Sequence, residues 1–441
     1  TQSGIEDPYR GKKRTYNMRA EGVINSQAMT QVVKGCPMAR VDCDNLDDLR
    51  LELDLLELQR LLYLSCWSRL WKQPEPPSER EVAREMAKPC KGFESLRRVL
   101  KGLGDQSKVL YLANSSGGIL FDILAIKVLL RRGHKVMLAL KDGFYYQTPT
   151  IWDHEHDETL AKALEDASIL HEDQMSKNQL LEATRENPFV VVCDGMGERL
   201  NLYRASVTFA RAWKEADLIL AKDDPHVRRL VKTSHAFTRD IMVFERDSDR
   251  QYVLHYKTRP KSIHKYSEGD LVDMADHITD SMRHAAQNGR SVMFYSAVVG
   301  SIPGQTKTAI KVLHTFVEYL RSRLDQAFII NPAEHFEQGM DGDDLMFMWE
   351  RVQRSGLIQV WRFQTVADIE KSFELMGEKV PPVWAGKDST YSTGCTKEMH
   401  IALEVQRKHP ELQIIGPSPD RFFRRREYGV GKYFDAGIEY Q

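Results

Sequence analysis

A regular alternation of short apolar segments with longer segments of helical periodicity begins near residue 108, and it constrains the fold most. Strands separated by helices pair in parallel and bury both faces of their sheet. The chain is therefore predicted to form an α/β domain with a doubly wound parallel sheet. We expect strands at KVLYLAN, KVMLAL, ASILHE, FVVVCDG, DLILAKDD, DIMVFER and QYVLHYK, and the last two, within 240–257, are expected to form an antiparallel pair.

A polar stretch, TRPKSIHKYSEGD, follows this pattern, and the same rhythm then restarts at SVMFYSAVVG. Further strands are expected at AFIIN, LIQVWRF and LQIIG, with helices between them. The restart predicts a second, Rossmann-like α/β domain over residues 270–441 that ends in a tail of arginines and aromatic residues. The first α/β domain is predicted to span residues 106–262.

The region before the first strand has a different character. Residues 1–45 are polar with little sustained periodicity, which predicts an extended arm. Residues 46–105 carry apolar residues at helical spacing. We expect a long helix at 46–71 and another near 78–103, together forming a helical segment that packs on the first domain.

Composition excludes several classes of protein. The chain has 62 Lys and Arg against 63 Asp and Glu, so no global charge attracts nucleic acid or an anionic membrane. The longest apolar runs contain charges and are too short to cross a bilayer. The six cysteines are scattered without a C-x-x-C pair, which fits a reducing compartment. We therefore expect a soluble, cytoplasmic protein that binds no specific nucleic acid.

The first turn of the α/β pattern is a candidate ligand site. In an open parallel sheet, ligands bind beyond the carboxyl ends of the strands, where helix N-termini attract anions. Two glycines would let a ligand approach the backbone, and two serines offer hydroxyl groups for capping or phosphate contact. A plain strand-to-helix turn with a serine cap remains an alternative. The loop consists of Asn114, Ser115, Ser116, Gly117 and Gly118.

Three segments resemble a known family: residues 109–157, residues 189–230 and the string YVLHYKTR. In order and spacing they resemble the damage-control phosphatases, also called domain of unknown function eighty-nine, over about residues 46–260. The resemblance implies a helical N-terminal part packed on a single α/β domain. It also implies hydrolysis of phosphate esters of small metabolites with a divalent metal ion.

The metal-ligand positions of that family are substituted here. The family has an Asp-Asn-x-Gly-Glu loop where this sequence has residues 114–118, so two expected ligands are replaced. Its third ligand, the Asp of an Asn-Asp-Val-Thr string, falls where this sequence has Gln147 and Thr148. Neutral oxygens offset the charge of a divalent cation far less than carboxylates do. We therefore predict that the chain has no metal ligands at this site and needs no cofactor.

The basic residues favour binding of an anion without a metal. Lys222 matches a lysine of the family, while Asp223 replaces the glycine that follows it, and Lys141 ends the second strand. Each lysine alone could equally be a solvated charge. We predict a divergent damage-control-phosphatase-like protein that binds a phosphorylated or acidic small molecule, or a protein partner; whether it is an enzyme stays open. The predicted ligand-binding residues are Asn114, Ser115, Ser116, Gly117, Gly118, Asp122, Lys141, Thr148, Lys222 and Asp223.

Two alternative functions remain open. The first is an active metal-dependent phosphatase with a site rebuilt either on Asp122, Asp153 and Asp157 or in a cleft between the two α/β domains. The second is a two-domain transferase that uses a cleft between the two α/β domains, which rests on the rhythm of the fold alone.

The second domain offers another candidate anion site. GSIPGQTKTA follows a strand and enters a helix, but its glycine and lysine are not adjacent as a nucleotide-binding P-loop requires. YSTGCTKE begins another helix with hydroxyl groups, although helix capping would explain these residues equally well. The predicted residues are Gly304, Lys307, Thr308, Thr393, Gly394 and Thr396.

The two ends of the chain are candidate surfaces for a protein partner. The N-terminal arm contains RGKKR, and the tail contains RFFRRR beside tyrosines. Such guanidinium and aromatic groups can bind an acidic face of another protein. The sequence does not predict an oligomeric state.

Overall fold

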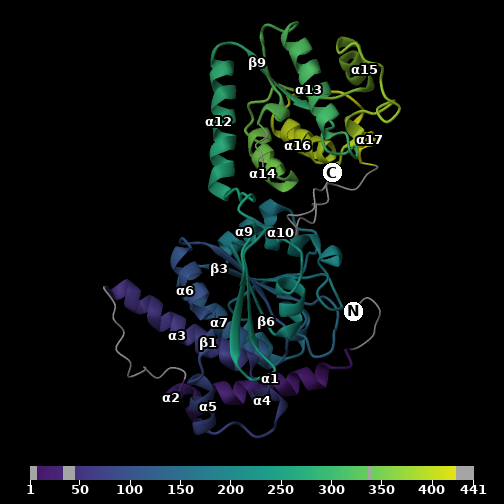
Figure 1. Ribbon diagram of the computed structural model, residues 1–441. Coiled ribbons are helices and arrows are strands. Elements are labelled where there is room, and N and C mark those ends of the chain that lie inside the picture. Colours follow the sequence, from purple (N-terminus) through teal and green to yellow (C-terminus); the bar gives the residue numbers. More distant parts are fainter. Residues whose placement is uncertain (1–6, 33–44, 336, 338–339, 424–441) are drawn as a thin grey trace. The chain divides into compact units, whose positions relative to one another are not determined.

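The computed structural model describes residues 7–32, 45–335, 337 and 340–423 of the chain (Figure 1). The chain divides into two compact units, with the boundary between Lys261 and Ser262. Each unit has its own sheet and its own hydrophobic core. The prediction of two α/β units with parallel sheets is confirmed.

The sheet of unit 1 has eight strands in the order β1-β8-β7-β6-β2-β3-β5-β4. All neighbouring pairs are parallel except β7 and β8, which form the expected antiparallel pair. The chain moves from β2 outward to β3 and β5, then returns to β6 on the other side of β2. Ligands in such folds bind beyond the strand ends at this reversal. The strands are β1 (Cys90–Lys91), β2 (Lys108–Leu112), β3 (Lys135–Leu140), β4 (Ser168–Leu170), β5 (Phe189–Cys193), β6 (Leu218–Lys222), β7 (Ile241–Arg246) and β8 (Tyr252–Lys257).

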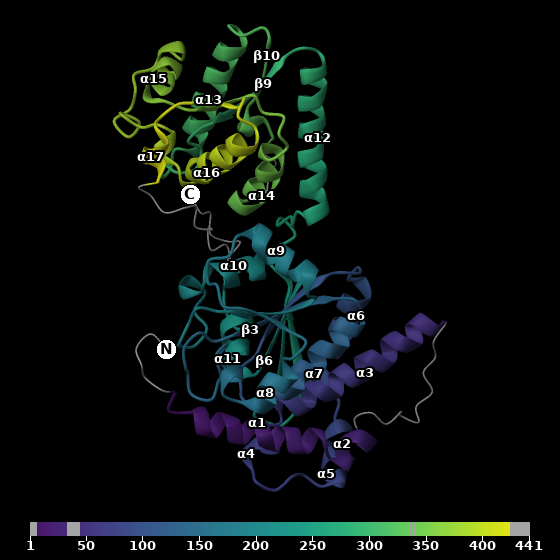
Figure 2. The ribbon, with the colours of Figure 1, turned by 180° about the vertical axis from the view of Figure 1, so that it is seen from behind.

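Helices cover both faces of this sheet. On β2, Val109 and Tyr111 face one core, which is shared with α3 and α7, while Leu110 and Leu112 face the other, which is shared with α10. Figure 2 shows α1, α3 and α7 together on the first of these faces. The helices of unit 1 are α1 (Arg10–Ile24), α2 (Gln27–Val32), α3 (Leu46–Cys66), α4 (Arg69–Lys72), α5 (Glu79–Met86), α6 (Phe93–Gly102), α7 (Gly118–Arg131), α8 (Glu158–Ala163), α9 (Lys177–Glu186), α10 (Val207–Glu215) and α11 (Asp224–His226); short turns are η1 (Asp153–Glu155), η2 (Leu202–Arg204) and η3 (Val227–Val231).

The prediction of an extended arm is wrong for the described residues before 33. Helix α1 packs on unit 1 through Tyr16, Ala20 and Val23, and it buries the polar side chains of Lys13 and Asn17 as well. So few apolar residues give a weak periodicity, which explains why the sequence pattern did not indicate a helix.

The prediction of a single helix near 78–103 is also wrong. Instead of one helix at 78–103, the chain forms α5, the short strand β1 and then α6. Pro89 cannot continue a helix, and Gly92 has a φ of +85° that suits glycine. The strand β1 extends the sheet by pairing with β8.

Unit 2 has a four-stranded parallel sheet in the order β10-β9-β11-β12. Here the chain reverses between β9 and β11, so the loops after these strands meet at the same sheet edge. The elements are α12 (Glu268–Gln287), β9 (Ser291–Ser296), α13 (Thr306–Arg321), β10 (Ala327–Ile330), η4 (Pro332–His335), α14 (Gly342–Gln353), β11 (Val360–Phe363), α15 (Val366–Leu375), η5 (Ser389–Tyr391), α16 (Thr393–Lys408), β12 (Gln413–Ile415) and α17 (Pro419–Phe422).

No helix among the described residues is long and apolar enough to cross a membrane. Most of the predicted arginine and aromatic tail, from residue 424 on, lies outside the described residues, as does the start of the predicted arm. The proposed roles of both ends in partner binding therefore stay predictions.

Candidate functional site

The loop after β2 lies at the carboxyl edge of the sheet of unit 1, as predicted. Asn114 follows β2 and donates through Nδ2 to Asp223 Oδ2 at 3.3 Å, and Asp223 follows β6. This hydrogen bond joins the two strands between which the chain reverses direction. The backbone N–H of Ser116 donates to the carbonyl of Gln147, from the loop after β3, at 2.8 Å.

The two glycines of this loop make room for the protein's own side chains. Gly117 has a φ of +79°, and a Cβ atom there would lie 2.3 Å from Cγ of Trp71. A Cβ atom on Gly118 would lie 2.6 Å from Ser115 Oγ and 2.7 Å from Lys222 Nζ. Residues larger than glycine at positions 117 and 118 would therefore clash with Trp71 and Lys222, which pack closely against the loop.

Lys222 and Asp122 form a completely buried ion pair beneath the loop. Both side chains are 0% exposed, and their Nζ and Oδ2 atoms lie 2.6 Å apart. Tyr111 donates to the other oxygen of Asp122 at 2.7 Å, and Ser65 accepts through its carbonyl from Lys222 at 3.2 Å. Burial would lower the pKa of Lys222, but the charges of Asp122 and Asp223 outweigh it and raise that pKa. Neither Asp122 nor Lys222 lines either of the two pockets that open beside the loop, so we place both beneath the site and not in it.

Two adjoining pockets open beside the loop, and they share Asn114, Tyr145 and Thr148. The first, which we call the cationic pocket, has a volume of about 360 Å³. Its charged and titratable lining residues are Lys141, Asp194, Arg199, Asp224, His226, Arg228 and Arg229. The second, which we call the aromatic pocket, has a volume of about 330 Å³ and is lined by residues that include Tyr16, Trp71, Ser115, Ser116, Tyr146 and Asp223.

Both acids of the cationic pocket are paired with cations. Lys141 donates to Asp194 Oδ2 at 2.6 Å, and the backbone N–H of Met196 donates to the other oxygen at 2.9 Å. Arg228 donates through Nε to Asp224 Oδ1 at 2.9 Å. The remaining positive charges in this pocket are those of Arg199 and Arg229.

Arg199 and Arg229 give the cationic pocket its excess positive charge. Arg229 donates to the carbonyl of Leu200, while Arg199 is exposed and has no hydrogen bond or ion pair with any residue that the structure describes. Burial lowers the pKa of Arg229, and the nearby charge of Arg199 lowers it further. Two guanidinium groups that repel each other favour an anion between or beside them.

The residues around the loop do not fit a divalent metal ion. Asn114, Ser115 and Thr148 offer neutral oxygens, and Asp223 is the carboxylate that accepts from Asn114. Asp194 and Asp122 are neutralised by lysines at 2.6 Å. A hard cation such as Mg²⁺ or Mn²⁺ is typically held by one or two carboxylates together with water. Of the carboxylates that line the two pockets, Asp194 and Asp224 are already paired with Lys141 and Arg228, which leaves Asp223.

The three aspartates of the possible rebuilt site do not gather at one point either. Asp122 binds Lys222, while Asp153 accepts from Lys13 Nζ at 3.0 Å. Asp157 caps α8 and accepts from Asn17 Nδ2 at 2.8 Å. Each carboxylate therefore has its own partner within the protein.

Helix α1 contributes residues that the sequence did not indicate. Asn17 is 1% exposed, and its Oδ1 accepts from the backbone N–H of Gly117 at 2.5 Å. That N–H stands at the start of α7, where an anion would otherwise bind. Tyr16, the residue before Asn17 in α1, lines the aromatic pocket. No motif marked these residues, because they approach the loop from a distant part of the chain.

The sequence also missed the cationic pocket's main residues. Arg199 follows β5, and His226, Arg228 and Arg229 follow β6. The string HVRR after a buried strand could have indicated them, because positive charges at the carboxyl edge of a parallel sheet point to an anion site.

In unit 2 the two predicted segments meet, but the side chains mostly serve the fold. Ser301, in the loop after β9, donates to Ser392 at the start of α16, with their Oγ atoms 3.2 Å apart. Ser392 caps α16, and Thr396 is buried with its hydroxyl bound to the carbonyl of Ser392 at 3.1 Å. The others are exposed or half-buried: Gly304, Lys307, Thr308, Thr393 and Gly394.

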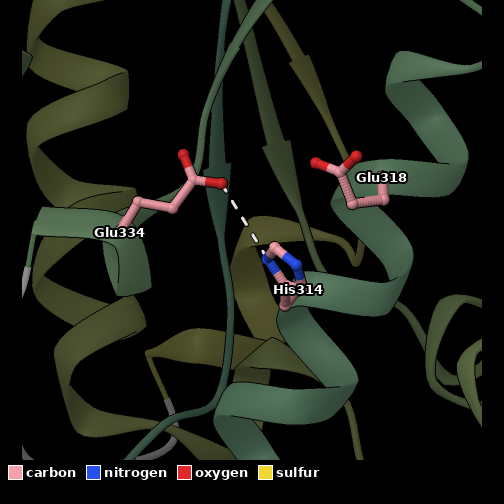
Figure 3. A group of neighbouring side chains, drawn as sticks. All are labelled: His314, Glu318 and Glu334. Atoms are coloured by element: carbon pink, nitrogen blue, oxygen red, sulfur yellow. Dashed lines mark ion pairs between the residues drawn. The ribbon is translucent and has the colours of Figure 1, made fainter.

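One group of potential metal-ligating atoms occurs among the described residues, at His314, Glu318 and Glu334 in unit 2 (Figure 3). All three side chains are exposed or nearly so, and Arg321 already lies between the two carboxylates. Its Nη1 is 2.7 Å from both Glu318 Oε1 and Glu334 Oε1, and its Nη2 is 2.9 Å from Glu334 Oε2. These contacts lower the pKa of Glu334. The guanidinium thus neutralises the cluster.

Comparison with known proteins agrees with the resemblance stated from the sequence. Residues 64–246 match the family model described as the damage-control phosphatase ARMT1-like domain. A similar solved structure is that of a DUF89 family protein from Pyrococcus horikoshii, at 16% identity and a TM-score of 0.38, covering 57% of this chain and 76% of that chain. No curated protein matches this chain. The matched range runs from the end of α3 to the end of β7 and includes both pockets' loops. The similarity to the damage-control phosphatase ARMT1-like domain therefore concerns residues 64–246, within unit 1.

Proposed function

We propose that unit 1 binds a phosphorylated small molecule in the cationic pocket and has lost the metal-dependent phosphatase chemistry of its family. The observation that carries this proposal is the pair Arg199 and Arg229, whose charges are not neutralised by the acids of the pocket. Arginine is well suited to phosphate because its planar group can donate two hydrogen bonds at once.

The size of the pocket favours a small molecule over a protein partner. Pockets for small ligands typically have volumes of about 300–1,000 Å³, and the cationic pocket, at about 360 Å³, falls at the lower end of this range. The adjoining aromatic pocket gives room for an organic group next to the phosphate. A protein could present a phosphorylated side chain to the same arginines, and this is one outcome of the test.

Loss of the metal is supported by the donor set at the loop. The positions that hold the metal in the family are Asn114, Ser115 and Thr148 here, and the nearest buried carboxylates are paired with Lys141 and Lys222. A protein ammonium group thus replaces much of the positive charge that a metal would supply. We propose no hydrolytic step for this site.

The binding of inorganic phosphate and glycerol 2-phosphate, measured by isothermal titration calorimetry, tests the proposal. Arg229→Gln should weaken both by at least about tenfold, because a charge-assisted hydrogen bond contributes roughly 1.5–3 kcal/mol. Arg283→Gln, an exposed arginine paired with Asp280 in unit 2, is the matched control and should bind as the wild type does. Equal weakening in both variants, or no binding by the wild type, would contradict a phosphate site at Arg229.

A direct assay tests the alternative that the protein is an active metal-dependent phosphatase. Turnover of a generic phosphomonoester is measured with Mg²⁺, Mn²⁺, Co²⁺ or Ni²⁺, and we expect no stimulation. Metal-stimulated turnover that Asp153→Ala abolishes would establish the rebuilt site instead.

A further inference from the structure

His226 lies in the cationic pocket next to its arginines. The side chain is 7% exposed, and it follows Lys222 by one turn at the end of β6. Its Nδ1 atom lies 2.7 Å from the carbonyl oxygen of Lys222. In the part of the chain that the structure describes, nothing hydrogen-bonds to Nε2, and that atom is not sealed from solvent.

The contact with Lys222 fixes the tautomer of His226. A carbonyl oxygen only accepts hydrogen bonds, so Nδ1 must carry a proton and donate it. Burial lowers the pKa of His226 to about 4, although the hydrogen bond to the Lys222 carbonyl and the charge of Asp223 oppose it; Lys141 and Arg229 lower this pKa further. The imidazole is therefore neutral near pH 7, and its Nε2 presents a lone pair to the pocket.

An acceptor without a partner beside the arginines gives the pocket a specific demand. The carboxylates of Asp194 and Asp224 already accept from Lys141 and Arg228, whereas no residue that the structure describes donates to Nε2 of His226. Arg199, Arg229 and Lys141 can only donate hydrogen bonds, and the Nδ2 of Asn114 already donates to Asp223. An anion with no hydrogen of its own would place its oxygens against the lone pair of Nε2. An anion that carries an O–H group would satisfy the arginines and Nε2 together.

We propose that His226 is a specificity-determining residue that selects anions bearing a hydroxyl donor next to the negative charge, such as hydrogen phosphate or a hydroxylated phosphate ester. This inference rests on the proposed function, because it assumes that the cationic pocket binds an anion. It goes further by assigning a role to His226 in the choice of anion.

Phosphate and sulfate form a matched pair of probes. At about pH 8 both are tetrahedral dianions, but hydrogen phosphate carries one O–H group and sulfate carries none. Calorimetric titration of the full-length wild-type protein should show phosphate bound at least about tenfold more tightly than sulfate, since one hydrogen bond is gained and one acceptor clash is avoided. Glycerol 2-phosphate and isopropyl phosphate repeat the comparison for esters with and without hydroxyl groups.

Two variants assign the preference to Nε2. His226→Phe keeps an aromatic ring without an acceptor and should bind phosphate and sulfate with equal affinity. His226→Gln restores an acceptor and should recover part of the preference. If phosphate and sulfate bind equally to the wild type, or if His226→Phe keeps the preference, the role of His226 is wrong while the phosphate site stands. If neither anion binds, the proposed function itself fails.

A measurement on the wild type avoids any effect of substitution on folding. Long-range proton–nitrogen NMR correlation of the imidazole should show neutral His226 with the proton on Nδ1 at about pH 6, and the Nε2 shift should move on addition of phosphate but not of sulfate. A protonated ring, or the opposite tautomer, would overturn the proposal.

Discussion

Single residues show how charge is handled at the edge of the first sheet. Lys222 and Asp122 are buried completely, beneath the loop that follows β2. The cost of removing two charges from water is offset only when the charges are close together and make further hydrogen bonds. Tyr111 and the carbonyl of Ser65 provide those hydrogen bonds here. The side chains of the chain itself thus satisfy the charges beneath the loop.

Glu398 in unit 2 is a second buried carboxyl group, and its hydrogen-bond partners are neutral. It lies on α16, accepts from Gln353 at 3.1 Å, and burial raises its pKa from the ordinary value of about 4.5 to about 7. The folded protein therefore holds a proton there that the unfolded chain has already released. The stability that this proton contributes is complete below about pH 4.5 and is lost as the pH rises to about 7.

Glu398→Gln should remove this pH dependence and stabilise the protein at neutral pH. The difference in the free energy of unfolding between variant and wild type should grow by about 3 kcal/mol between pH 4.5 and 7, from 1.36 kcal/mol per pKa unit. Urea unfolding followed by tryptophan fluorescence at several pH values measures it. Glu370→Gln, on the exposed side of α15, is the control. A constant difference across this pH range would show that Glu398 ionises normally.

At the scale of elements, helix α1 belongs to the site of unit 1. Asn17 bridges Gly117 and Asp157, and Lys13 binds Asp153. Arg19 donates to the carbonyl of Lys72 at 3.2 Å. These contacts fasten α1 to three different loops, so the helix closes the side of the aromatic pocket.

Asn17→Ala should loosen α1 more than the rest of unit 1. Both hydrogen bonds of the buried amide are lost, and Asp157 and the N–H of Gly117 are left without these partners, at a cost of roughly 1–3 kcal/mol each. Hydrogen exchange read by mass spectrometry should therefore accelerate in residues 10–24. In the control Thr15→Ala the hydroxyl bonds only within its own helix, to Gly11, so exchange should change little. Uniform acceleration across unit 1 would contradict a local role.

The elements that the sequence predicted well are those with strong local patterns. Each expected strand of both units is present within a few residues, because buried parallel strands are short apolar runs with clear ends. The helix α1 was missed because only Tyr16, Ala20 and Val23 mark its apolar face. The loop at 114–118 was located correctly, yet its glycines serve Trp71 and Lys222, which come from distant parts of the chain.

At the scale of the whole molecule, the chain is two α/β units, and the family match lies within the first. The site of unit 1 combines loops after β2, β3, β5 and β6 with α1, which precedes the matched residues. Sequence spacing alone could not indicate the pairing of Lys141 with Asp194 or of Lys13 with Asp153, since these partners meet only after folding. We propose that the protein itself supplies all the positive charges of the phosphate site.

The most direct test of that account is the affinity for glycerol 2-phosphate with and without metal. Protein treated with EDTA and dialysed is titrated by calorimetry, first without metal and then with an excess of Mn²⁺. We predict the same dissociation constant in both titrations, because arginine and lysine supply the charge that a metal would otherwise provide. Binding that appears only with Mn²⁺, or tightens tenfold or more on its addition, would contradict the central claim.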